Sequence, residues 1–216
     1  MTCPLPARKT QYNLKNMFAY EVLMTAFIAP PQHIPLLLRI GLWFAKRATG
    51  KDLLPARLLA WYPKAAVGSG ALEALVAHQD GRLDERILKL VRMQASFAAA
   101  CPFCIDMNSF QHEAAGISPA ELRALQGLEP PEQVDSFTPR ERLAIHYARL
   151  ISQTPLRFPP AFIDELKQHF NEREIVILAS TAAQVNYWAR LIQALGVPPA
   201  GFSDQCELPG AGQPAK

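Results

Sequence analysis

Residues 83–109 read LDERILKLVRMQASFAAACPFCIDMNS and combine a strong helical pattern with a pair of cysteines. In the first part, apolar residues recur at helical spacing, which predicts a helix from Leu83 to about Ala99. Its apolar side is expected to consist of Ile87, Leu88, Leu90, Val91, Ala95 and Ala98, and its polar stripe of Glu85, Lys89, Arg92 and Ser96.

The cysteine pair, Cys101 and Cys104, marks the start of the next predicted helix. Cys101 is expected as the N-cap, Pro102 occupies the first helical position, and Gly116 is expected to end the helix. Two thiols at this spacing can close a disulfide or share a proton. Backbone N–H groups at a helix N-terminus favour the thiolate, so this is the first place to look for chemistry.

The rest of the chain is also helical in pattern, and no run alternates as a strand does. Capping boxes predict helices from Ser118 and from Thr138, the latter to about Ser152, with a Pro- and acid-rich loop between them. Further helices are expected at 34–47, 55–61, 71–77, 161–170 and 172–195, with Gly68 and Gly70 as a break. We therefore predict an all-α fold.

A faint internal repeat relates residues 84–91 to residues 172–179. Each segment begins a long predicted helix, and each is expected to be followed by a helical segment that a glycine closes. The second copy lacks the cysteines. The repeat predicts a bundle of two pseudo-repeated halves, only one of which carries the chemistry.

Composition and charge limit the function classes. The chain of 216 residues is half hydrophobic, typical of one globular domain. Its net charge of +3 hides a basic N-terminal part, with eight Lys/Arg against two acids in residues 1–60. We interpret this part as a solvated face and expect neither nucleic acid nor a membrane surface as partner. No signal peptide is recognised, and Cys3 and Cys206 lie in Pro-containing ends, so we expect a reducing cytoplasm.

The cysteine pair has two other interpretations, a zinc site and a pair of buried core residues. A structural zinc site needs four ligands, and one pair with only His112 nearby does not supply them, so no metal is expected. Burial of both thiols as small hydrophobes is the second alternative. The helix start at Pro102 favours redox chemistry over both.

A proton relay for the thiols needs further residues. On a continuous helix, Cys104, Asn108 and His112 would share one face, but Asn108 takes no proton and His112 lies about 12 Å along the axis. The polar candidates on the preceding helix are Lys89, Arg92 and Ser96, of which a nearby Lys or Arg would lower a thiol pKa by its charge. A solvated helix face is the alternative for Lys89 and Arg92.

Residues 83–116, and above all the segment 101–109, resemble the carboxymuconolactone decarboxylase / alkylhydroperoxidase D-like family. Segments 137–144, 170–176 and 195–198 resemble its longer members. The resemblance covers roughly residues 70–203, from which we expect a basic helical extension at 1–60, a domain at 61–203 and a flexible tail at 204–216.

The resemblance implies an all-helical homo-oligomer whose peroxidase branch reduces organic hydroperoxides with a dithiol that an electron-donor protein re-reduces. It implies that Cys104 attacks the peroxide and that Cys101 resolves the sulfenic acid to a redox-active disulfide, without another cofactor. The family's relay glutamate and histidine are Lys89 and Asn108 here, which leaves Lys89 to act by charge. The alternatives are a non-redox decarboxylase-like enzyme and a non-catalytic member.

Overall fold

The computed structural model describes residues 26–76 and 83–203, which form helices and turns with no strand among them. The all-α prediction is confirmed. The elements are α2 (Leu36–Thr49), α3 (Leu54–Leu58), the 3-10 helix η1 (Leu59–Trp61), α4 (Pro63–Val76), α5 (Glu85–Ala98), α6 (Pro102–Ser109), α7 (Pro119–Leu125), the 3-10 helix η2 (Pro131–Gln133), α8 (Pro139–Ile151), α9 (Pro160–His169) and α10 (Glu172–Ala194).

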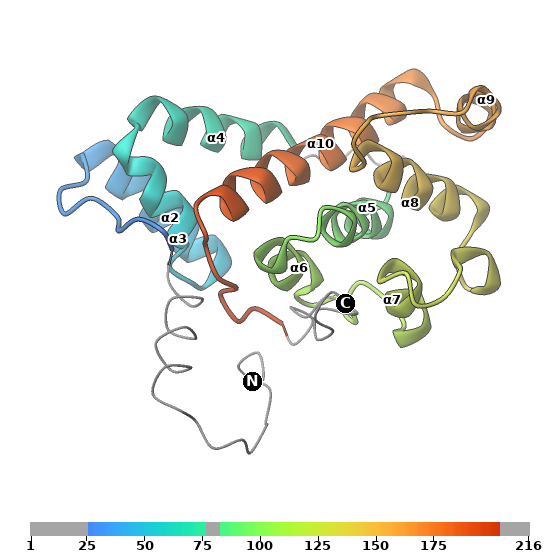
Figure 1. The fold of residues 1–216 in the computed structure, drawn as a ribbon, viewed down its shortest axis with the longest axis horizontal. Helices are drawn as coiled ribbons and strands as arrows, with labels where there is room; N and C mark the ends of the chain where they lie inside the picture. Colours follow the sequence, from blue (N-terminus) through green and yellow to red (C-terminus); the bar gives the residue numbers. More distant parts are fainter. Residues whose placement is uncertain (1–25, 77–82, 204–216) are drawn as a thin grey trace, which may run out of the picture.

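Helix α5 is the central helix and packs against α6, α8 and α10 (Figure 1). Its buried side chains divide between two apolar clusters. Leu88, Val91 and Ala95 pack with side chains of α8, α9 and α10. On the other side, Leu90 and Met93 pack with side chains of α6, α7 and α8. Because α5 is covered on both sides, the helix that leads into the cysteine pair is held firmly in the core.

Local capping explains where several helices begin. The predicted capping boxes at Ser118 and Thr138 are both present, and Asn171 forms a third at the start of α10. In each box the N-cap side chain accepts from the backbone N–H three residues on, while the glutamate there accepts from the N-cap N–H. These caps satisfy backbone groups that the first turn of a helix leaves unpaired.

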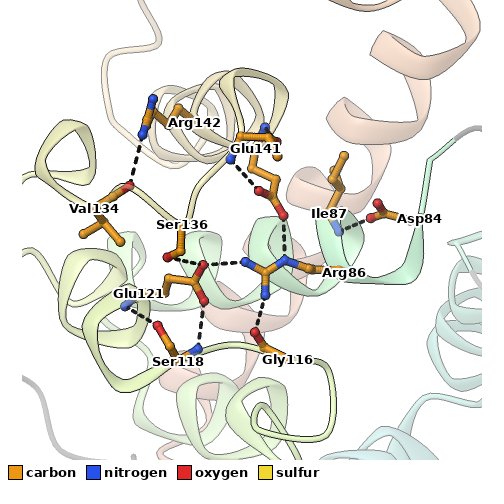
Figure 2. Close-up of polar contacts among 11 residues, drawn as sticks. Asp84, Arg86, Ile87, Gly116, Ser118, Glu121, Val134, Ser136, Glu141 and Arg142 are labelled. Carbon is orange, nitrogen blue, oxygen red and sulfur yellow. Dashed lines mark hydrogen bonds and ion pairs between the residues drawn. The ribbon is translucent and has the colours of Figure 1, made fainter.

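Arg86 of α5 joins two of these capping boxes (Figure 2). Its guanidinium bonds Glu121 at 2.5 Å and Glu141 at 2.6 Å, and it also donates to the Gly116 carbonyl. Both carboxylates are almost fully buried. One partly buried cation therefore fixes the starts of α7 and α8 against α5.

Helix α4 corrects the prediction of a break at Gly68 and Gly70. Both glycines lie inside α4, and the chain breaks earlier, at Tyr62 (φ −131°, ψ 88°). Pro63 explains this position, because proline disfavours the helical conformation in the residue before it. Of the run predicted at 71–77, residue 77 lies outside the described residues.

Helix α6 is shorter than predicted. It ends at Ser109, because Phe110 is extended (ψ 131°) and Gln111 has a positive φ of 54°. The expected glycine, Gly116, does adopt a positive φ (71°), but it closes the turns that follow α6. His112 therefore lies outside the helix that carries Cys104 and Asn108, and the predicted common face of the three residues is wrong.

The two long helices of the predicted repeat, α5 and α10, pack against each other. Gly196 (φ 64°) follows the end of α10, as expected. The helical segment that follows the second copy is the rest of α10, up to Ala194. The predicted tail at 204–216 lies outside the described residues.

Candidate active site

The cysteine pair opens α6 as the sequence predicts. Cys101 is the N-cap, and its sulfur accepts a hydrogen bond from the Cys104 backbone N–H at 3.3 Å. The two Sγ atoms are 2.6 Å apart, and both cysteines are free. Cys101 is 0% and Cys104 is 3% exposed, and both pack among side chains that include Leu58, Ala189 and Ile192. The pair is thus a buried dithiol within reach of disulfide formation.

The pKa values of the two thiols are shifted in opposite directions. The hydrogen bond between the two sulfurs lowers the pKa of Cys101 against the raising effect of burial, and the N–H groups of Cys104 and Phe103 lower it further. The same hydrogen bond raises the pKa of Cys104, as do burial and the negative charge on Cys101. When the pair loses one proton, the negative charge is therefore favoured on Cys101 and the remaining proton on Cys104.

Cys104 lines a cavity of about 470 Å³, whereas Cys101 is not among the lining residues. The walls come from α2, α3, α4, α5, α6, α10 and the connections between α2, α3 and α4. The larger apolar side chains are Leu38, Leu42, Leu53, Pro55, Leu59, Phe103, Met107, Val185 and Ile192, and the polar ones are Thr49, Ser69, Glu73, Arg92, Asn108, Gln184 and Trp188. A ligand in this cavity would meet Cys104 first, with Cys101 behind it.

Asn108 lies in this cavity wall, one turn beyond Cys104 on α6. Its Nδ2 donates to Ser96 Oγ at 2.9 Å, and Ser96 Oγ donates in turn to the Arg92 carbonyl at 2.8 Å. Asn108 thus ties α6 to α5 beside the cavity. Its expected hydrogen bond to a thiolate stays a prediction.

Lys89 does not line the cavity that Cys104 and Asn108 line. Its ammonium donates to the Phe110 carbonyl at 2.6 Å, at the far end of α6, and Lys89 is not among the cavity-lining residues. Burial first, and then the nearby Arg92 charge, together lower the pKa of Lys89 to about 8. These contacts give no support to the expected action of Lys89 on the thiols by charge.

His112 lies in the turn after α6 and is not a lining residue either. Its Nδ1 is 3.0 Å from the Ser109 carbonyl. A catalytic role for His112 stays a prediction without a contact to support it. In the described residues, no group of three or more His, Cys, Asp or Glu side chains could hold a metal ion.

Glu73 of α4 is the lining residue that sequence reasoning missed. Its Oε1 accepts from Gln184 Nε2 at 2.7 Å and from Trp188 Nε1, both on α10. Burial lowers the pKa of Arg92, which also lines the cavity, and the Glu73 charge opposes that effect. The available signal was a single acid in the apolar run 71–77, but the sequence did not show which helix this run faces.

Comparison with solved structures defines the class of protein. The debrominase Bmp8 in complex with 2,3,4-tribromopyrrole superposes with a TM-score of 0.70 at 18% identity, over 83% of this chain and 94% of Bmp8. A peroxidase-related protein of Ralstonia eutropha with an alkylhydroperoxidase AhpD core gives 0.68 at 17% identity, over 82% and 94%. The chain has the all-helical alkylhydroperoxidase D-like fold, and the expected resemblance is confirmed in its fold.

Sequence relatives extend the likeness. The chain is 27% identical over 183 residues to the uncharacterized protein YnjA of Escherichia coli, which covers 84% of this chain and 97% of YnjA. It is 26% identical over 109 residues to the uncharacterized protein YdfG of Bacillus subtilis, over 50% of this chain and 72% of YdfG. No family model matches the chain. A match over 84% of the chain necessarily includes part of residues 1–60, so the likeness reaches beyond the expected boundary at residue 60.

Proposed function

We propose that the protein is a thiol-dependent hydroperoxide reductase, or more broadly a dithiol oxidoreductase, that acts through Cys101 and Cys104. The observation that carries the proposal is the placement of Cys104 on the wall of an apolar cavity with the Cys101 sulfur 2.6 Å away. A sulfur that meets the substrate and a second sulfur behind it are the two parts that peroxide reduction by a dithiol requires.

The reaction begins with a proton shift inside the pair. The Cys104 proton passes to Cys101, and the Cys104 thiolate attacks the terminal oxygen of the hydroperoxide. The O–O bond breaks, Cys104 becomes a sulfenic acid, and the alkoxide takes a proton from water to leave as an alcohol. Cys101 then attacks the Cys104 sulfur, and the displaced hydroxide takes the Cys101 proton and leaves as water. The net products are a disulfide, an alcohol and one hydroxide, which a solvent proton converts to water.

A reductant must return the disulfide to the dithiol. The resemblance implies an electron-donor protein, and a dithiol protein can serve by thiol–disulfide exchange. We also propose a homo-oligomer, as in the resembling family. In the part of the chain that the structure describes, no helix has the length and apolar character needed to cross a membrane.

The proposal is tested by intact mass and thiol alkylation after treatment with cumene hydroperoxide. Wild type should lose about 2 Da, with peptide mapping placing the disulfide at Cys101 and Cys104. Cys104→Ser should not react, whereas Cys101→Ser should accumulate a sulfenic acid on Cys104 that dimedone traps. Cys3 and Cys206 serve as internal controls that should stay reduced. If wild type keeps all of its thiols at millimolar peroxide, the proposed function is wrong.

A second candidate is thiol-dependent reduction of a halogenated aromatic ring. It is favoured by the cavity, whose apolar walls and volume would accept a substituted ring, and by the similarity to a debrominase structure. The same dithiol balances this reaction, since an aryl bromide and two thiols give the dehalogenated ring, bromide, a proton and a disulfide. Release of bromide that Cys104→Ser abolishes would identify this activity. The non-redox alternative instead requires activity that survives replacement of both cysteines by serine.

A further inference from the structure

The cavity is larger than a small peroxide needs. Its volume of about 470 Å³ is in the range of pockets that bury organic ligands of drug size. Hydrogen peroxide, at roughly the volume of one or two water molecules of about 30 Å³ each, would leave most of it unfilled. The free volume next to Cys104 therefore depends on the size of the side chains that line the cavity.

Helix α4 presents small side chains to the cavity. Its lining residues are Ala66, Ser69, Gly70 and Glu73. They follow the spacing i, i+3, i+4 and i+7, which places them on one face of the helix. Gly68 lies between them in the sequence but is not a lining residue.

Helix α2 also lines the cavity, mostly with small side chains. Its lining residues are Leu38, Gly41, Leu42, Ala45, Ala48 and Thr49, which again follow helical spacing along one face. Four of these six side chains are no larger than threonine. The space next to Cys104 is thus left open by two helices, α2 and α4.

The two glycines are the most open positions on these faces. A Cβ atom added to Gly41 or to Gly70 would meet no atom within 4 Å. Gly68 has the same freedom but lies off the cavity face. A leucine side chain adds four carbons, on the order of 100 Å³ if each takes about the volume of one water molecule. At either lining position this would fill about a fifth of the cavity volume of about 470 Å³.

We propose that Gly41 and Gly70 determine substrate size, because they keep open the space next to Cys104 that a bulky, largely apolar hydroperoxide would occupy. The part of the proposal that concerns hydroperoxides rests on the proposed function. The part that concerns the size of molecule admitted to Cys104 depends only on the cavity.

The test compares Gly70→Leu and Gly41→Leu with the matched control Gly68→Leu. All three replace a helical glycine with a better helix former, so none is expected to prevent folding. With cumene hydroperoxide, we expect kcat/KM to fall at least about tenfold in the Gly70 and Gly41 variants, as for other pockets in which a substrate group is excluded. With hydrogen peroxide all variants should stay close to wild type, and wild type should prefer cumene hydroperoxide.

A second measurement separates this inference from the proposed function. In a Cys101→Ser background, Cys104 is alkylated with iodoacetamide or with the bulkier N-phenylmaleimide, which needs no peroxidase activity. Gly70→Leu and Gly41→Leu should slow only the bulky reagent, and Gly68→Leu should slow neither. If wild type reacts with no hydroperoxide but the glycine variants slow only N-phenylmaleimide, the proposed function is wrong and the role of the two glycines in limiting size is supported. Equal slowing of both reagents, or of neither, overturns the role of the two glycines.

Discussion

At the scale of single residues, the two cysteines differ in their surroundings, because Cys104 lines the cavity and Cys101 does not. Cys101 as N-cap and Pro102 at the first helical position follow from sequence neighbours alone. Which sulfur faces the cavity depends on α2, α4 and α10, which are distant in sequence. The same holds for the cations, because Arg92 lines the cavity and Lys89 instead bonds a carbonyl of the turn after α6.

Lys89 provides a prediction about pH. Its pKa is lowered to about 8 in the folded protein, chiefly by burial, whereas the unfolded chain keeps the ordinary value near 10.5. Between these values the unfolded state binds more protons, so stability should rise with pH over this range. Below about pH 8 the buried charge should be destabilising throughout. NMR of ¹³C-dimethylated lysines should show one signal with a midpoint of about 8 that is missing in Lys89→Arg. A midpoint near 10.5 for that signal would contradict the prediction.

At the scale of elements, helix starts were easier to predict than helix ends. The boxes at Ser118 and Thr138 depend on side chains three residues apart, so their positions can be read directly from the sequence. The end of α6 depends on the turn conformation at Phe110 and Gln111, next to the carbonyl that Lys89 bonds. The two glycines in α4 looked like a break because their unfavourable helix propensity is local, whereas Pro63 had already set the start of that helix.

Arg86 should be the costliest ion-pair residue to remove among these elements. Arg86→Met leaves the buried carboxylates of Glu121 and Glu141 without their cation, which should cost about 3–5 kcal/mol of unfolding free energy at pH 7. Burial alone would raise the pKa of Glu121, but the Ser118 N–H and the Arg86 guanidinium hold it below the ordinary value. The stability that this lowered pKa provides is present above the unfolded value and is lost as pH falls through the folded one. Urea unfolding at pH 7 and pH 4 should therefore show a smaller deficit at the lower pH.

Arg123→Met is the matched control for this prediction. Its ion pair with Glu129 is exposed, with side chains 55% and 36% accessible. Such pairs contribute at most about 1 kcal/mol. A loss in Arg86→Met as small as that in the control, or one that does not change with pH, would show that the buried network adds little stability.

At the scale of the whole molecule, helix α2 carries several large apolar side chains that are exposed in the part of the chain that the structure describes. One face lines the cavity, but α2 has no fully buried residue, and its other large apolar side chains are exposed. These are Leu36, Leu37, Ile40, Trp43 and Phe44, with Trp43 59% and Phe44 61% accessible. A helix with apolar residues on both sides needs a second surface to cover it. The homo-oligomer implied by the family resemblance would supply that surface as a second copy of this chain.

The proposed oligomer and the cavity can be tested together. Sedimentation velocity should give a mass above the monomer for wild type, and the monomer for Trp43→Glu combined with Phe44→Glu, since two buried charges would oppose association. Val176→Glu, an exposed apolar position on α10, is the control and should not change the mass. Because α2 forms a cavity wall, its release should also speed the alkylation of Cys104 by N-phenylmaleimide in the Cys101→Ser background. A wild type that is monomeric at micromolar concentration would show that α2 is not covered by a second copy. The cavity wall would then have to be held by the contacts of one chain alone.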